Sequence, residues 1–421
     1  MKVLSVNISD TNGGAARAAY RIHQAVNEQG VDAKMFVKNK NSTDKRVFEV
    51  ADFDKKYLFS DQIRFVQNKV KNKIQQHRWR PYPDREDVFM SDLRSSSIHG
   101  AFQKIDFDLL HLHWINLRFL NLKELLKVNK PIVWTLHDCW AFTGVCHYFY
   151  DCEKYKDSCG ECPFLHSTDK HDLSYQVWRK KEHIYSKLNL HIVTPSRWLG
   201  EAAKQSTLFK NFPLTVIPNS IDTELFKPIN KTDARQKLNL DNDKKYILYG
   251  AMNAVKDSRK GFCELLQAMK FLEKKECLNK VELIVFGADK PLEQLQLKIP
   301  VSYLGVLNND KDIIAAYNAA DVMVVPSLSE NLSNAIMESL SCGTPVTAFN
   351  IGGNSDMIEH QKNGYLAKEQ DSADLANGIL WCLENNGKGD LSKNARRKVM
   401  GNYTNEIVGK QYANLYFSFY K

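Results

Sequence analysis

The sequence predicts an α/β protein built from two doubly wound domains, each a mostly parallel sheet with helices on both faces. Three observations lead to this prediction. The chain has 421 residues, more than a single hydrophobic core usually accommodates. Short apolar runs alternate with longer amphipathic segments, which is the pattern of strand–helix units. Turn formers at 217–222 and a polar stretch at 231–245 divide this alternation into two halves.

Eight apolar runs are predicted to be buried strands, and three amphipathic segments to be helices. The ends of the strands matter most, because ligands of doubly wound sheets bind beyond the carboxyl ends of the strands. We expect a first domain at 1–222, a second at 223–405, and a final helix at 406–421 that returns to the first domain. The predicted strands are 3–6, 109–113, 132–136, 191–194, 246–249, 282–286, 322–325 and 345–349, and the helices include 15–29, 261–272 and 333–341.

The composition is that of an ordinary globular protein with a formal net charge of +9. A basic balance favours anionic partners such as nucleotides or a phospholipid surface. A nucleic-acid partner is not expected, because the basic residues are diffuse and no recognised binding module is present. No apolar run is long enough for a membrane span. The N-terminus reads as a strand and not as a signal peptide, so we expect a cytoplasmic protein.

The most informative segment runs from strand 322–325 through a polar turn into helix 333–341, which Gly343 and Pro345 end. The free N–H groups and the dipole at the start of such a helix suit a diphosphate. Glu330 lies just before the helix and Glu338 about two turns along it, a rise of roughly 12 Å. A carboxylate can accept hydrogen bonds from two hydroxyls. The pair therefore matches the diols on either side of the diphosphate of a nucleotide-sugar.

This segment resembles the signature of the retaining glycosyltransferases of family 4, which have two Rossmann-like domains facing a central cleft in the GT-B arrangement. Glu330, Glu338 and the Cys-Gly-Thr-Pro-Val sequence at 342–346 match that signature. The resemblance implies that Glu330 holds the transferred sugar and Glu338 the ribose of the donor. It also implies retention of anomeric configuration, with the leaving phosphate helping to deprotonate the acceptor. The pattern is closest to a subgroup that builds bacterial polysaccharides.

The chain departs from the family pattern at two places. Asn331, Leu332 and Ser333 stand where the family commonly has Phe-Gly. These positions contact the donor sugar in the family, so the identity of the sugar does not carry over. The later Gly-Gly-x-x-Glu element reads Gly-Gly-Asn-Ser-Asp at 352–356, with Asp356 in place of the glutamate.

Fixed cations, and not a metal ion, are expected to balance the charge of the leaving diphosphate. Asp-x-Asp patterns, which in metal-dependent transferases hold a divalent cation, occur at 52–54, 106–108 and 241–243. Because the pattern occurs three times in this chain, it does not by itself indicate a metal site. The family binds the phosphates with an Arg and a Lys-Gly pair after the first strand of the second domain. Lys260 matches the lysine, whereas Arg259 is adjacent to it and not several residues earlier. Val306 lies in a segment that resembles the base-contacting element. We therefore expect catalysis without a required cofactor.

Two loops of the first domain are assigned to the acceptor side of the reaction. Gly13 and Gly14 follow the first strand and open a helix that carries Arg17, and glycines let a backbone approach a ligand closely. The resemblance places such a loop near the donor phosphates, which we assign to Gly14, and near the acceptor, which we assign to Gly13 and Arg17. It also implies that His137 contacts the donor sugar or the acceptor, beside Asp138. A satisfied strand-end histidine is the alternative interpretation.

Four cysteines form a separate pattern, C-x5-C-x6-C-x2-C, at Cys146, Cys152, Cys159 and Cys162. Four thiolates suit a tetrahedral structural zinc ion, and C-x2-C is a favoured half of such a site. Free thiols and disulfides are the alternatives. A zinc ion here would hold a long loop of the first domain and would take no part in catalysis.

The sequence therefore predicts a transferase of a hexose from a nucleotide diphosphate sugar. The expected acceptor is a glycan or a polyprenyl-diphosphate-linked oligosaccharide in capsule, exopolysaccharide or lipopolysaccharide assembly. A sugar-nucleotide epimerase of the same fold, and an inactive sugar- or lipid-binding relative, are the alternatives. A basic amphipathic helix predicted at 55–80 either contacts the inner face of the cytoplasmic membrane or is an ordinary surface helix.

Overall fold

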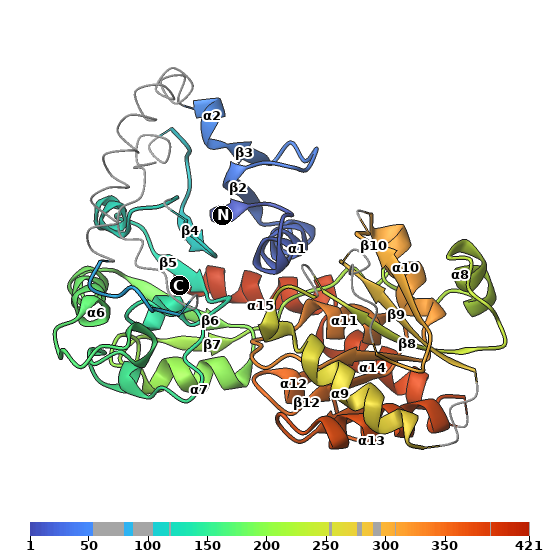
Figure 1. Cartoon of the computed structure of the whole chain (residues 1–421). Helices are drawn as coiled ribbons and strands as arrows, with labels where there is room; N and C mark the ends of the chain where they lie inside the picture. The colour runs from blue at the N-terminus through green and yellow to red at the C-terminus, as the bar shows by residue number, and fades with distance from the viewer. Residues whose placement is uncertain are drawn as a thin grey trace. The chain divides into compact units, whose positions relative to one another are not determined.

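The computed structural model describes residues 1–53, 80–86, 104–117, 119–251, 255–275, 280–288, 296–307, 309–387 and 389–420. The chain forms two compact units, Met1–Pro218 together with Gly409–Lys421, and Asn219–Val408 (Figure 1). The basic helix predicted at 55–80 lies outside the described residues except for its last residue. Within the described ranges, no helix has the length and apolar composition that a membrane span requires.

The first unit contains a seven-stranded parallel sheet in the order β3-β2-β1-β4-β5-β6-β7. The strand order reverses between the neighbours β1 and β4, which makes their carboxyl ends the switch point of the sheet. The helices of this unit are α1 (Gly14–Glu28), α2 (Val50–Phe53), α6 (Leu173–Tyr185) and α7 (Arg197–Gln205). The strands are β1 (Lys2–Ser9), β2 (Asp32–Asn39), β3 (Val47–Glu49), β4 (Leu109–Leu112), β5 (Ile132–Thr135), β6 (Leu190–Thr194) and β7 (Leu214–Val216).

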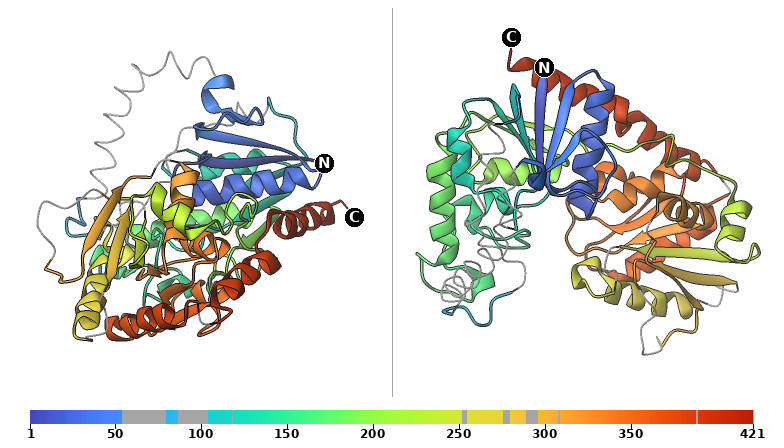
Figure 2. Two further views of the ribbon diagram at one scale, coloured as in Figure 1. Left: turned by 90° about the vertical axis from the view of Figure 1, so that its right-hand side faces the viewer. Right: turned by 90° about the horizontal axis from the view of Figure 1, so that it is seen from above.

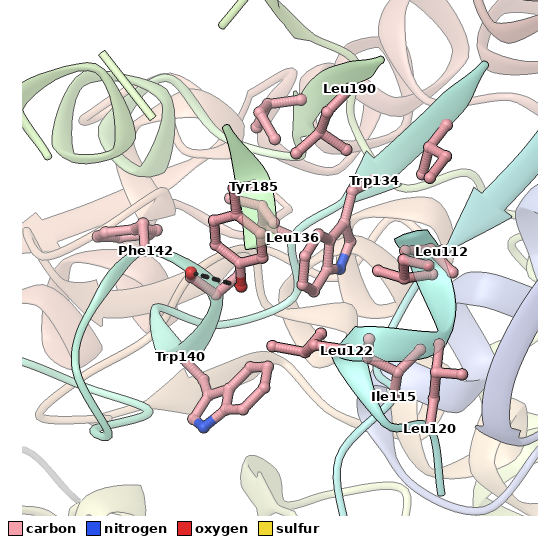
Figure 3. Close-up of a cluster of buried hydrophobic side chains, with 14 of the residues drawn as sticks. Leu112, Ile115, Leu120, Leu122, Trp134, Leu136, Trp140, Phe142, Tyr185 and Leu190 are labelled. Atoms are coloured by element: carbon pink, nitrogen blue, oxygen red, sulfur yellow. Dashed lines mark hydrogen bonds between the residues drawn. The ribbon is translucent and has the colours of Figure 1, made fainter. Parts of the chain in front are cut away.

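A dense aromatic core lies under the carboxyl ends of β4 and β5. Figure 3 shows Trp134, Phe142 and Tyr185 gathered with aliphatic side chains from β4 and the segments that follow it. The Tyr185 hydroxyl donates to the carbonyl of Ala141 at 3.2 Å. These buried contacts fix the loop after β5, which carries candidate functional residues.

The second unit contains a six-stranded parallel sheet in the order β10-β9-β8-β11-β12-β13, with the switch point between β8 and β11. The strands are β8 (Lys245–Gly250), β9 (Val281–Phe286), β10 (Val301–Gly305), β11 (Val322–Val325), β12 (Val346–Phe349) and β13 (Gly364–Ala367). The helices are α8 (Lys231–Lys237), α9 (Phe262–Glu273), α10 (Asp310–Ala319), α11 (Asn334–Ser341), α12 (Asn354–Met357), α13 (Ser372–Asn385) and α14 (Leu391–Asn402).

Helices cover both faces of this second sheet. Tyr246 and Leu248 of β8 join one buried cluster with residues of α10, α11 and α14. Ile247 and Tyr249 join another with residues of α9 and α13. Successive side chains of a strand point to opposite faces, so each strand contributes to both clusters. This two-sided burial explains why its strands are continuous apolar runs.

The final helix, α15 (Asn405–Ser418), begins in the second unit and ends in the first. Gly409 packs so tightly on α1 that a Cβ there would lie 2.4 Å from the carbonyl oxygen of Ala25. Further along, the Tyr416 hydroxyl lies 2.7 Å from Nδ1 of His111 on β4. Both views of Figure 2 show the C-terminal end of α15 near the N-terminus of the chain.

The predicted fold class, two doubly wound parallel α/β units, is confirmed. All eight predicted strands are present, with ends that differ by a few residues at most. The eight predicted strands do not include β2, β3, β7, β10 and β13. β2 and β3 carry charged residues, and β10 is only partly buried, so these strands lack the continuous apolar run of a central strand.

Candidate active site

The switch point of the second sheet brings a lysine and a glutamate together. Lys260 follows β8 and Glu330 follows β11, and the loops after these adjacent strands meet because the strands are parallel neighbours. Nζ of Lys260 lies 2.9 Å from Oε2 of Glu330. The two side chains are 20% and 12% exposed, so water screens this ion pair only partly.

Backbone contacts that only glycine permits hold these two loops together. Gly261 has φ 72°, and a Cβ there would lie 1.8 Å from the carbonyl oxygen of Pro326. The N–H of Leu328 donates to the carbonyl of Arg259 at 2.9 Å. The Lys-Gly pair at 260–261 therefore has a structural cause beside any role in binding. The glycine lets the lysine's loop lie against the turn that carries Glu330.

Arg259 lies in the same loop. Its guanidinium forms an ion pair with Asp257 at 2.9 Å and donates to the carbonyl of Ser329 at 3.3 Å. Asp257 in turn accepts the backbone N–H of Arg259. This arrangement keeps a second positive charge beside Glu330.

The Gly-Gly element supports Glu330 from the other side. Gly352 has φ 51°, and a Cβ there would lie 1.7 Å from the carbonyl oxygen of Glu330. Gly353 donates its N–H to the carbonyl of Asn331 at 2.8 Å. The glycines thus let one loop lie directly on the backbone of the glutamate. Asp356, which replaces the family's glutamate, is partly exposed in α12.

The surroundings of Glu330 keep it ionised. Burial alone raises the pKa of a carboxyl group, but Lys260 and Arg259 lower it, and the pKa of Glu330 falls below its ordinary value. An ionised carboxylate is purely an acceptor of hydrogen bonds. Glu330 can therefore receive the hydroxyl groups of a ligand near neutral pH.

Glu338 occupies a different environment on α11. It is 4% exposed, and its Oε2 accepts a hydrogen bond from the Tyr317 hydroxyl of α10 at 3.0 Å. The helix ends at Ser341, and Gly343, the residue after its C-cap, has φ 78°. The N–H of Thr344 then donates to the carbonyl of Ser339 at 2.9 Å. The Gly-Thr-Pro-Val sequence thus forms the turn between α11 and β12.

The three residues that follow Glu330 are buried in the free protein. Asn331, Leu332 and Ser333 are 5%, 6% and 6% exposed. Ser333 is the N-cap of α11 and accepts the N–H of Ile336. Val306, by contrast, is 59% exposed just after β10.

The loops after β4 and β5 bring a second group of polar residues together, in the first unit. Nε2 of His137 lies 3.1 Å from Nδ1 of His113. Burial lowers the pKa of His137 to about 4, so this ring is neutral at physiological pH. Asp138 is adjacent and is bound on both carboxylate oxygens. The pairing of His113 with His137 was not predicted from the sequence, because it depends on the register of β4 and β5.

The glycine loop after β1 has a conformational role. Gly13 is the residue before α1 and has φ 102°, which L side chains avoid. Its carbonyl accepts the N–H of Arg17 at 2.9 Å. Gly14 is the exposed first residue of the helix, and Arg17 lies partly buried in its first turn.

The four cysteines of the long loop line one small pocket in the first unit. They are free thiols, and burial raises the pKa of Cys162 to about 11. Among the residues described by the structure, no three His, Cys, Asp or Glu side chains are grouped so that they could hold a metal ion. The structural zinc ion therefore stays a prediction, which a metal analysis of the purified protein tests.

Two doubly wound parallel sheets in separate units are the architecture of GT-B glycosyltransferases, and solved glycosyltransferases have the same fold as this chain. The chain belongs to glycosyltransferase family 4. Residues 12–225 match the family described as Glycosyltransferase Family 4, and residues 230–404 match the one described as Glycosyl transferases group 1. The predicted family and fold are thereby confirmed.

Relatives and solved structures agree with this assignment. The chain is 24% identical over 386 residues to the putative colanic acid biosynthesis glycosyl transferase WcaC of Escherichia coli, covering 88% of each protein. It is 27% identical over 201 residues to an Escherichia coli UDP-Gal:alpha-D-GlcNAc-diphosphoundecaprenol alpha-1,3-galactosyltransferase, covering 45% of the chain and 50% of the relative. Anabaena Alr3699/HepE, solved with UDP-glucose, has the same fold with TM-score 0.65 and 19% identity, covering 99% of this chain and 100% of that one.

Proposed function

We propose that this glycosyltransferase moves a hexose, with retention of anomeric configuration, from a nucleotide diphosphate sugar to a glycan or a polyprenyl-diphosphate-linked oligosaccharide. The product would enter a bacterial surface polysaccharide. The relative WcaC is named for colanic acid biosynthesis, which supports a role of this kind. The names of the galactosyltransferase and of the HepE complex both mention UDP. UDP-hexoses are therefore the first donors to test.

One observation carries the proposal: the Lys260–Glu330 ion pair, 2.9 Å long, at the switch point of the second sheet. A cation and a carboxylate side by side match a ligand that has an anionic group next to hydroxyl groups. A nucleotide diphosphate sugar has this pattern where its diphosphate joins the transferred hexose. Lys260 would contact the diphosphate, and Glu330 would accept hydrogen bonds from hydroxyl groups of the hexose.

The proposed chemistry needs charge stabilisation more than it needs a protein acid or base. The bond from the anomeric carbon to the diphosphate oxygen breaks, and negative charge develops on that oxygen. Lys260, Arg259 and the N-terminus of α11 would stabilise this charge. The departing phosphate oxygen would take the proton of the attacking acceptor hydroxyl. Fixed cations would serve here without a divalent metal, so activity is expected to survive EDTA.

A thermal-shift screen tests the donor half of the proposal. UDP-, GDP- and ADP-hexoses are added to the full chain, and one nucleotide series is expected to raise the Tm in a concentration-dependent way. Proton NMR of the product then gives the anomeric configuration. A product with inverted configuration would reject retention. A sugar changed while still attached to its nucleotide would support an epimerase instead.

A further inference from the structure

Tyr317, on helix α10, lies between that helix and the end of the neighbouring strand β9. It is 1% exposed, and its ring meets the ring of Phe286 edge to face, with the ring centroids 6.1 Å apart. Both rings belong to the buried cluster that α10 and α11 share. Packing at the density of a protein interior leaves the hydroxyl group of Tyr317 few positions to occupy.

Tyr317 contacts α11 and the turn after it at two places. Its hydroxyl donates a hydrogen bond to Oε2 of Glu338, in the middle of the helix, at 3.0 Å. Its backbone carbonyl accepts a hydrogen bond from the hydroxyl of Thr344, in the turn after the helix, at 2.7 Å. Because the second contact fixes α11 relative to α10, the first contact fixes the carboxylate of Glu338 relative to both helices.

A hydrogen bond from a buried phenol prepares a carboxylate for a ligand. The terminal torsion of a glutamate side chain is broad, so an unrestrained carboxylate has many orientations and loses conformational entropy when it binds. The hydroxyl of Tyr317 selects one orientation before the ligand arrives. A carboxylate has about four lone pairs, so one hydrogen bond from the tyrosine leaves Glu338 with the capacity to accept others.

We propose that Tyr317 is a positioning residue for the nucleotide of the donor. Its hydroxyl holds the carboxylate of Glu338 in the orientation that accepts the ribose hydroxyls, and it thereby sets a preference for ribonucleotides over 2′-deoxyribonucleotides. The inference rests on the proposed function, in which the donor is a nucleotide diphosphate sugar, and on the family resemblance, which assigns the ribose to Glu338. A 2′-deoxyribose lacks one hydroxyl of the ribose diol, so it gains less from an oriented carboxylate.

Calorimetry on the full chain tests the proposal. The probes are UDP, GDP and ADP, each paired with its 2′-deoxy form. We expect the wild-type protein to bind one ribonucleotide about tenfold more tightly than its 2′-deoxy form, as the loss of a hydrogen bond to a carboxylate implies. Tyr317→Phe removes only the hydroxyl and keeps the ring against Phe286. It should weaken binding of the ribonucleotide about fivefold and leave the 2′-deoxy form within about twofold, so that the preference falls to about twofold.

Tyr365→Phe is the matched control. It removes the same kind of hydrogen bond in the same unit, from a tyrosine hydroxyl to the carboxylate of Asp374 at 2.9 Å, and it should keep the wild-type preference. A double-mutant cycle with Glu338→Gln then shows whether Tyr317 acts through Glu338. In the Glu338→Gln protein, Tyr317→Phe should have no further effect on nucleotide binding.

Three results would overturn the inference while the nucleotide still binds. They are a wild-type preference in Tyr317→Phe, a wild-type preference in Glu338→Gln, and an equal effect of Tyr317→Phe with and without Glu338→Gln. The first and third leave the ribose with Glu338 and remove only the role of the tyrosine. The second removes the ribose from Glu338. Absence of binding for all six probes would instead reject the proposed class of donor, and the inference with it.

Discussion

At the scale of the residue, the two glutamates of the donor signature have unlike partners. Glu330 pairs with the cation Lys260, whereas Glu338 accepts a hydrogen bond from the neutral phenol of Tyr317. Lys260 neutralises Glu330 in the free protein and would be shared with a diphosphate in the complex. Glu338 lies away from that cation, which fits a hydroxyl acceptor at the other end of the donor. Substitutions of the two glutamates should therefore have different effects on nucleotide binding and on turnover.

Glu330→Gln and Glu338→Gln separate these two roles. UDP contains the ribose but no hexose. We expect Glu338→Gln to weaken UDP binding about tenfold, because a buried acceptor of the ribose hydroxyls is lost. We expect Glu330→Gln to leave UDP binding within about twofold and to lower turnover of the UDP-hexose about 100-fold, as the loss of one transition-state contact does. Calorimetry with UDP and a radiolabelled transfer assay measure the two quantities, and the reverse pattern would exchange the assignments.

At the scale of the element, the proposed donor site is a set of loops held together by close backbone contacts. The loop after β8, the turn before α11 and the Gly-Gly loop before α12 meet through Gly261 and Gly352, where a Cβ would lie within 2 Å of a carbonyl oxygen. The position of Glu330 therefore depends on close backbone contacts that these two glycines permit.

Gly352→Ala tests this dependence. The substitution places a Cβ 1.7 Å from the carbonyl oxygen of Glu330 and puts alanine at φ 51°. The left-handed backbone alone costs about 1–2 kcal/mol, and relief of the clash moves Glu330. A lower Tm and a higher KM for the donor are expected. Gly401→Ala in α14, where a Cβ meets open space, is the control and should keep both values. A Gly352→Ala protein with wild-type KM would show that Glu330 tolerates the displacement.

The sequence revealed the elements of the proposed donor site better than the contacts between the loops of the first unit, for a physical reason. Glu330, α11 and Gly343 are contiguous, so local patterns and the family resemblance identify them together. Lys260 is 70 residues away from Glu330 and was found only through the resemblance. His147 and Trp114 meet at Asp138 through the register of β4 and β5 and the path of the cysteine loop. No local pattern encodes such a meeting, so these contacts at Asp138 could not be predicted from the sequence.

At the scale of the whole molecule, buried neutral histidines and the last helix stabilise the first unit. His111 on β4 has Nε2 2.7 Å from the Thr135 hydroxyl and Nδ1 2.7 Å from the Tyr416 hydroxyl. Tyr412 also contacts Thr135, at 3.0 Å. Helix α15 thus closes a hydrogen-bonded network over the sheet, between residues about 300 positions apart. This network contains no carboxylate to balance a proton on His111.

The stability of the first unit should therefore fall in mild acid. Burial lowers the pKa of His111 to about 3, against an ordinary value of about 6.5. As the pH falls, His111 therefore binds a proton in the unfolded chain at a higher pH than it does in the folded chain. The stabilisation is complete above about pH 6.5 and is lost as the pH falls toward 3, by about 2 kcal/mol at pH 5. Denaturant unfolding at pH 7 and pH 5 measures this loss, and His111→Asn should reduce the difference. An unchanged free energy of unfolding between the two pH values would reject the role of the histidine.

The central claim is that the ion pair at the second switch point is the donor-phosphate site, and Lys260→Ala tests it most directly. The measurement is the kcat for hexose transfer from the UDP-hexose that gives the largest thermal shift. Lys270→Ala, an exposed lysine on α9, is the matched control. We predict that Lys260→Ala lowers kcat at least about 100-fold, as loss of a charge-stabilising group does, while Lys270→Ala stays at the wild-type value. Wild-type kcat in a folded Lys260→Ala protein would contradict the claim.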